Sequence, residues 1–236
     1  MIKNKVNTLL VWDLPTRLFH WALVCSIVYA WVSVEILEDM EQHFYAGYSV
    51  LTLILFRLIW GLIGSKYSRL KRLFFPLSET LKYAKGLFSR KSTAAKNQEH
   101  LGHNPLGSLS VIAILSILLI QATLGMFSTD GYVFGPLAGL LSAETRDQIT
   151  QLHLDNIVLI YAILGLHVAA IFFHQVVKKE NLTRTMITGK KAGESAHPET
   201  HKSPWLALAI LILCAGFVYW LSTAYLDLIP LDDFGY

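Results

Sequence analysis

Residues 153–177 read HLDNIVLIYAILGLHVAAIFFHQVV, an apolar run that carries three histidines. About 20 apolar residues suffice for a helix to cross the roughly 30 Å of hydrocarbon in a bilayer. We therefore predict a membrane-spanning helix over residues 155–177, with His153 just before it. His167 follows His153 by 14 residues, so on one helix their imidazoles face within about 40° of each other and stand about 21 Å apart along the axis.

The same criteria predict four more membrane spans. The chain has 236 residues, of which 53% are hydrophobic and 16% charged, on the apolar side of the globular range. No small-residue cleavage site follows a short apolar core, so we expect the first span to be a mature helix and not a signal peptide. The additional predicted spans cover residues 18–36, 44–63, 107–127 and 204–224. The sequence thus predicts an all-α integral membrane protein, with four spans in residues 1–191 and a tether (193–203), a fifth span and a short tail in 192–236. Residues 66–102 and 178–202 are expected to be loops.

Basic residues indicate how the chain sits in the membrane. Eighteen of the twenty Lys and Arg residues fall in three segments on one side of an alternating five-span chain. Three lie at the N-terminus (Lys3, Lys5, Arg17), nine between residues 66 and 96, and six between 178 and 202. The positive-inside rule predicts that this side is cytoplasmic, with the C-terminus in the periplasm. Orientation and anionic lipid heads account for the net charge of +3, so no nucleic-acid partner is implied.

Both cysteines, Cys25 and Cys214, lie inside predicted spans and form no CxxC or CxxCH pattern. This excludes covalent c-type haem attachment and a cysteine zinc cluster. We expect both to be small packing residues.

Four histidines form two pairs when they are ordered by depth. His20 lies in the first turn of the first span, at the cytoplasmic level of His167, and His43 opens the second span at the periplasmic level of His153. Bis-histidine ligation between facing helices is a standard way to hold b-type haem. The depths predict one haem between His20 and His167 and another between His43 and His153. A zinc or copper transporter would need ligands that converge within a few ångströms, which two histidines about 21 Å apart on one helix do not.

Two further residues of the second span bear on these sites. Arg57 follows His43 by 14 residues and reaches the depth of the cytoplasmic pair, where a buried guanidinium needs an anion. A haem propionate or the carboxylate of Asp13 would supply this anion equally well. Gly47 stands one turn from His43, where a missing side chain lets a porphyrin approach, although helix packing explains a membrane glycine as well.

Several motifs resemble the bacterial cytochrome b561 and nickel–iron hydrogenase cytochrome b subunit family. They are WDLPTRLFHW at residues 12–21, Arg57 with Trp60-Gly61, HNPLG at 103–107, and His167-Val168 through ENL at 180–182 to MITGKK at 186–191. The resemblance covers about residues 10–191. It implies a four-helix, di-haem, quinone-linked cytochrome with axial ligands at His20, His43, His153 and His167. The fifth helix departs from the four-helix core.

The resemblance further implies electron transfer between the quinone pool and a periplasmic partner in the inner membrane. That partner would be a c-type cytochrome or a dehydrogenase or hydrogenase subunit, and the chain an electron-transfer subunit more than a complete enzyme. The alternatives are a stand-alone haem oxidoreductase acting on a small oxidant, and a histidine-bearing transporter or anchor without haem. A quinone site is expected beside the cytoplasmic haem at His103, Asn104 and His174. Equally, Asn104 would simply cap the third span and His174 lie at the lipid interface.

Overall fold

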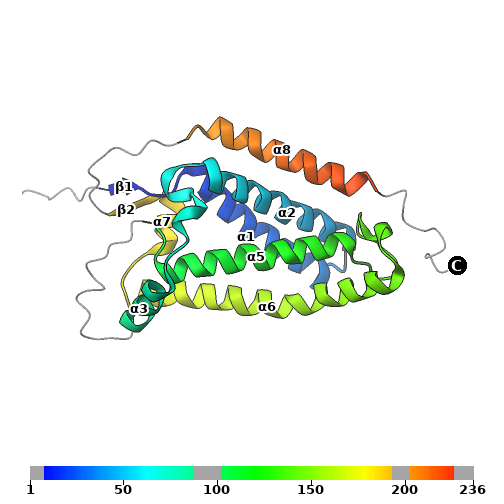
Figure 1. Cartoon of the computed structure of the whole chain (residues 1–236), viewed down its shortest axis with the longest axis horizontal. Coiled ribbons are helices and arrows are strands. Elements are labelled where there is room, and N and C mark those ends of the chain that lie inside the picture. The colour runs from blue at the N-terminus through cyan, green and yellow to red at the C-terminus, as the bar shows by residue number, and fades with distance from the viewer. Residues whose placement is uncertain (1–7, 88–101, 193–201, 226–236) are drawn as a thin grey trace, which may run out of the picture.

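The computed structural model describes residues 8–87, 102–192 and 202–225, and within them five helices dominate. All five are long and apolar enough to cross a membrane, which confirms the predicted all-α membrane fold. They are α1 (Leu14–Glu35), α2 (Met40–Ile63), α5 (Pro105–Phe127), α6 (Ala143–Val176) and α8 (Pro204–Thr223). Figure 1 shows them running side by side along the long axis of the molecule.

The helices form two packed pairs and one outlying member. α1 packs on α2, α5 packs on α6, and α2 joins the pairs through its contact with α5. α8 lies on the outside of the bundle against α2 (Figure 1). Its buried residues recur every three or four positions and form one face: Ala207, Ile210, Cys214 and Val218. The fifth helix therefore packs on the outside of the other four, and its buried face joins their hydrophobic cluster.

Each membrane helix begins at a residue whose side chain accepts a backbone N–H of the first turn. The caps are Asp13 for α1, Asp39 for α2, Asn104 for α5, Ser142 for α6 and Ser203 for α8. Proline follows within two residues of the caps of α1, α5 and α8. An N-cap and an early proline satisfy or remove the N–H groups that have no partner within the helix, so local sequence fixes where these helices start.

The fourth span differs from its prediction, because α6 begins at Ala143 and not near residue 155. His153 consequently lies within the helix and not before it. The 34 residues of α6 span about 51 Å, well beyond the hydrocarbon thickness. The first three turns of α6 are polar, so they give no hydropathy signal. The side chain of Ser142 caps this end of the helix, and the hydroxyl of Thr150 donates to the carbonyl of Arg146 one turn earlier.

Short elements cover one end of the bundle, here called the basic end (Figure 1). They are β1 (Thr8–Leu10), the 3-10 turns η1 (Lys66–Ser68) and η2 (Leu70–Arg72), α3 (Leu77–Leu87), α7 (Leu182–Thr188) and β2 (Lys190–Ala192). The strands pair antiparallel, with Leu9 opposite Lys191. Gly189 ends α7 at a φ of 77°, and its carbonyl accepts the N–H groups of Val11 and Trp12. The N-terminal segment is thereby tied to the chain that follows α6.

The opposite end, here called the acidic end, holds the α1–α2 turn and the α5–α6 connection with η3 (Ala138–Leu140). At the basic end, the structure places the short elements η1, η2, α3, α7 and β2 within residues 66–102 and 178–202, where the sequence predicts loops. These elements are too short and polar to give a hydropathy signal. The predicted tether at 193–203 lies almost wholly outside the described residues.

Candidate haem sites

Two of the predicted ligand histidines face each other at the acidic end. The ring centres of His43 on α2 and His153 on α6 are 6.3 Å apart, with their planes at 84°. A metal–imidazole bond is about 2 Å long, so an iron held by both rings would keep their centres about 6 Å apart. The spacing of these rings fits one iron between them.

Hydrogen bonds orient both imidazoles for that task. The Nδ1 atom of His43 lies 3.0 Å from the carbonyl oxygen of Ala30 on α1, and the Nδ1 atom of His153 lies 3.1 Å from that of Gln121 on α5. A carbonyl only accepts, so each Nδ1 carries the proton and each Nε2 keeps its lone pair. Such outer hydrogen bonds are the usual means of fixing the tautomer of a metal-binding histidine.

The space between these histidines accepts a flat, apolar group. A cavity of about 490 Å³ opens between the α1–α2 and α5–α6 pairs, and its walls are almost entirely apolar. Two glycines shape it. A Cβ at Gly125 would come within 3.0 Å of the His153 ring, whereas a Cβ at Gly47 would meet nothing within 4 Å. Gly125 lets His153 approach α5, and Gly47 leaves open space one turn from His43, as a porphyrin requires.

The other two predicted ligands lie within electrostatic range of each other at the basic end. His20 on α1 and His167 on α6 lie close enough for their imidazoles to interact electrostatically. The Nδ1 atom of His20 is buried without a hydrogen-bond partner. His103 lies near both rings and packs against Trp12, with ring centres 4.6 Å apart. Three imidazoles therefore lie near one another at the basic end. The sequence predicts His20 and His167 as ligands and His103 as part of a neighbouring quinone site.

A buried polar network lies beside this cluster. Asp13 accepts hydrogen bonds from the N–H of Thr16, the indole of Trp60 and the hydroxyl of Ser68, at 3.0, 3.1 and 2.9 Å. Arg57, only 3% exposed, donates instead to the carbonyl of Ser68 at 2.8 Å. Asp13 lies within electrostatic range of Arg57, but its oxygens are already used by other donors. A guanidinium has five N–H donors, of which the hydrogen bond to Ser68 uses one.

Charge states at this end follow from burial and hydrogen bonds. Burial alone would raise the pKa of Asp13, but hydrogen bonds from Thr16, Ser65 and Ser68 outweigh it and hold that pKa below its usual value. Burial and the nearby Arg57 charge lower the pKa of His103 to about 3, so this ring is neutral at physiological pH.

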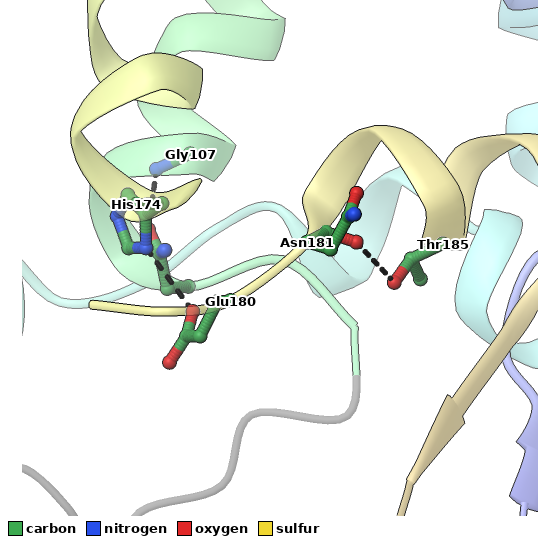
Figure 2. A network of polar contacts seen from close by, with 6 residues as sticks. Gly107, His174, Glu180, Asn181 and Thr185 are labelled. Atoms are coloured by element: carbon green, nitrogen blue, oxygen red, sulfur yellow. Dashed lines mark hydrogen bonds and ion pairs between the residues drawn. The ribbon is translucent and has the colours of Figure 1, made fainter. Parts of the chain in front are cut away.

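The remaining quinone-site candidates have structural partners. Asn104 caps α5, its side-chain oxygen accepting the N–H of Gly107 at 2.7 Å. His174 is buried in the last turn of α6, with Nδ1 3.1 Å from the Glu180 carboxylate (Figure 2). The hydrogen bond from His174 lowers the pKa of Glu180. His174 thus contacts Glu180 of the same chain and does not face open lipid. Asn104 caps α5, which is the alternative to a quinone-binding role.

Sequence reasoning missed three residues around His153. Gln121 and Gly125 on α5 and Asn156 on α6 surround its ring or support it. A signal existed, because Gln121 and Asn156 are amides inside long apolar spans, where buried polar groups need partners. Their joint position depends on how α5 packs on α6, which the sequence pattern does not specify.

Comparison with known proteins found a matching family and two similar relatives. The model of the prokaryotic cytochrome b561 family matches residues 11–189. Two similar curated relatives are probable Ni/Fe-hydrogenase B-type cytochrome subunits, from Azotobacter vinelandii and Azotobacter chroococcum mcd 1. Each is 24% identical over 228 residues, which cover 83% of this chain and 93% of the relative. No solved structure matches the chain.

Proposed function

The chain belongs to the prokaryotic cytochrome b561 family, and from this premise we propose that it carries two b-type haems and links the quinone pool to a redox partner at the acidic end. Membership makes it a multi-pass bacterial membrane protein of haem-dependent electron transfer. The imidazoles of His43 and His153 carry the proposal. A backbone carbonyl holds the proton of each ring on Nδ1, and the ring centres lie 6.3 Å apart at an apolar cavity.

In the proposed arrangement each residue has a defined role. His43 and His153 hold the acidic-end haem, and His20 and His167 hold the basic-end haem. Haem b supplies a one-electron iron couple when bound. The buried guanidinium of Arg57 suits a propionate of the basic-end haem. The 14 residues between His153 and His167 correspond to about 21 Å along α6, so two haems held there would carry electrons across most of the membrane.

We further propose that the basic end faces the cytoplasm. The described short elements there include Lys66, Arg69, Lys71, Arg72, Lys82, Lys85, Lys190 and Lys191. Reporter fusions after Lys191 should therefore read cytoplasmic, and fusions after Glu41 and Asp147 periplasmic. The reverse pattern would place the quinone-linked end in the periplasm and overturn the orientation.

The partner is proposed from the named relatives and from the short connections at the acidic end. Both relatives are named as hydrogenase cytochrome subunits. The α1–α2 turn spans only residues 36–39, and the α5–α6 connection residues 128–142. Neither can hold a catalytic domain. A hydrogenase or other dehydrogenase subunit, or a c-type cytochrome, would therefore supply the substrate chemistry.

The direct test is anaerobic reduction of the purified protein by a quinol. We expect two haems b per chain and haem reduction by quinol alone. Asn104→Ala and His174→Ala should each weaken quinol reduction, with the apparent KM rising about fivefold if one hydrogen bond of about 1 kcal/mol is lost.

Structural effects need separate controls, because Asn104 caps α5 and His174 contacts Glu180. Asn104→Ser retains a capping oxygen but removes the amide, and Glu180→Gln weakens the ion pair while retaining His174. If quinol kinetics follow helix stability in these variants, or stay unchanged in all of them, the quinone site lies elsewhere. A preparation that turns over a small oxidant without any partner would favour the stand-alone oxidoreductase instead.

A further inference from the structure

Two arginines fall outside the three basic segments that indicate the orientation of the chain, and both are buried. Arg57 lies on α2 within electrostatic range of His103 at the basic end, and Arg146 lies near the start of α6 at the acidic end. Their exposed fractions are 3% and 4%. Arg146 is the only Lys or Arg in the α1–α2 and α5–α6 connections and the helix turns next to them. The charge asymmetry of the membrane therefore does not account for it.

The position of Arg146 is unfavourable for a cation on two counts. The residue belongs to the first turns of α6, where the helix dipole presents partial positive charge. Burial also removes water from the guanidinium, which is strongly destabilising unless an anion compensates. The ring of Phe134 lies 5.1 Å from the guanidinium carbon, but a cation–π contact supplies no full negative charge. A carboxylate, whose geometry matches a guanidinium, would offset both costs.

Arg146 lies on the same face of α6 as the predicted ligand His153. Seven residues separate them, so their side chains point within about 20° of each other and stand about 10 Å apart along the axis. The hydroxyl of Thr150 donates to the carbonyl of Arg146 at 2.9 Å and accepts the N–H of Thr129 at 3.1 Å. Thr150 and Thr129 both line the cavity. Arg146 is thus tied to the wall of the cavity on its acidic side.

This side of the cavity carries negative charge of its own. Glu35 and Asp130 are among the residues that line it. The Asp130 carboxylate accepts the N–H groups of Tyr132 and Val133 at 2.9 and 2.7 Å, so it stabilises its own turn. A haem propionate placed here would meet like charge. A cation beside the cavity is needed to hold it, and Arg146 is the one that the sequence supplies.

We propose that Arg146 binds a propionate of the acidic-end haem, as the counterpart of Arg57 at the basic end. The proposal rests on the proposed function, because it requires haem at His43 and His153. A guanidinium can bind a carboxylate through two parallel hydrogen bonds, which would fix the porphyrin edge as well as its charge. The fixed positive charge favours the reduced haem, which carries one electron more. Arg146 would therefore also raise the reduction potential of this haem.

The test combines haem release and potentiometric titration of the full-length protein with Arg146→Met and Arg146→Lys. The acidic-end haem is the component absent from His43→Leu. In Arg146→Met we expect its midpoint potential to fall and its release to excess apomyoglobin to be about tenfold faster, the effect of losing one hydrogen bond to a charged group. Arg146→Lys keeps the charge and should recover most of both. Arg184→Met, at an exposed arginine of α7, is the matched control and should shift neither midpoint.

Haem dimethyl ester tests the propionate directly, because it keeps the iron and porphyrin but lacks the carboxylates. Wild-type protein loaded with the ester should release the acidic-end haem as fast as Arg146→Met releases haem b. With the ester, Arg146→Met should change nothing further. Phe134→Leu removes the cation–π contact but keeps the guanidinium, so its acidic-end midpoint should stay near that of the wild type.

The outcomes separate this inference from the proposed function. Unchanged release and midpoint of the acidic-end haem in Arg146→Met, with two haems bound, overturn the role of Arg146 and leave the ligand pairs standing. An effect of Arg146→Met that persists in full with the ester also overturns it, because the guanidinium would then act on another anion, such as Glu35. Equal shifts in Arg184→Met or Phe134→Leu count against it in the same way. A wild-type protein that binds no haem at His43 and His153 would defeat the proposed function itself.

Discussion

Leucine at His43 or at His153 is expected to remove the same haem, so that either variant retains about one haem where the wild type binds two. Leucine has no lone pair for iron, and losing one of two axial ligands lowers haem affinity whichever side is lost. The His43→Leu/His153→Leu double variant should therefore lose nothing further. Haem content by pyridine haemochrome and a reduced-minus-oxidised spectrum measure the effect.

His20→Leu and His167→Leu should form a second set that removes the other haem. Losses should be equal within a pair and additive between pairs, because the two sites share no ligand. If His20→Leu and His43→Leu remove the same haem, the proposed pairing is wrong. Two low-spin haems after His167→Leu would indicate a substitute ligand. His103 suits that role better than His174, because it lies beside His20 and His167, whereas His174 is paired with Glu180.

The transmembrane helices could be predicted because their cause is local. A run of about 20 apolar residues and a capping Asp, Asn or Ser suffice to set each helix, and neither depends on distant contacts. An apolar run gives no prediction for the parts of a helix that continue beyond the hydrocarbon. The polar turns of α6 before residue 155, together with α3 and α7, show no hydropathy signal, and β1–β2 pairing joins residues about 180 positions apart in the sequence.

The sequence predicts the depth of each ligand histidine in the membrane, but not the direction in which its imidazole faces. Depth along a helix follows from counting residues, so the four histidines could be assigned to two levels. Which carbonyl fixes each imidazole depends on the rotation and approach of a neighbouring helix. Gly125 shows this well, because its effect is to admit a side chain from α6 that lies 28 residues further along the chain. The anion that Arg57 binds stays a prediction, because Asp13 lies within electrostatic range of the guanidinium while its oxygens accept hydrogen bonds from Thr16, Trp60 and Ser68.

The cavity at the acidic end allows a test that leaves all four histidines in place. In Gly47→Leu the new side chain would extend into the space one turn from His43, where a Cβ meets no atom within 4 Å. The polypeptide should fold, because the added Cβ requires no neighbour to move, but the leucine would occupy part of the volume that a porphyrin needs. We expect loss of the haem that His43→Leu also loses, and retention of the basic-end haem.

Graded and matched variants make the result specific to the cavity. Gly47→Ala adds one carbon and should weaken haem retention without abolishing it. Gly216→Leu is the control, because a Cβ there also meets nothing within 4 Å, yet Gly216 lies on α8 and does not line the cavity. This control should bind both haems. If Gly47→Leu also retains both with unchanged spectra, the cavity between His43 and His153 is not where the porphyrin lies. The ring spacing at the acidic end would then reflect helix packing alone.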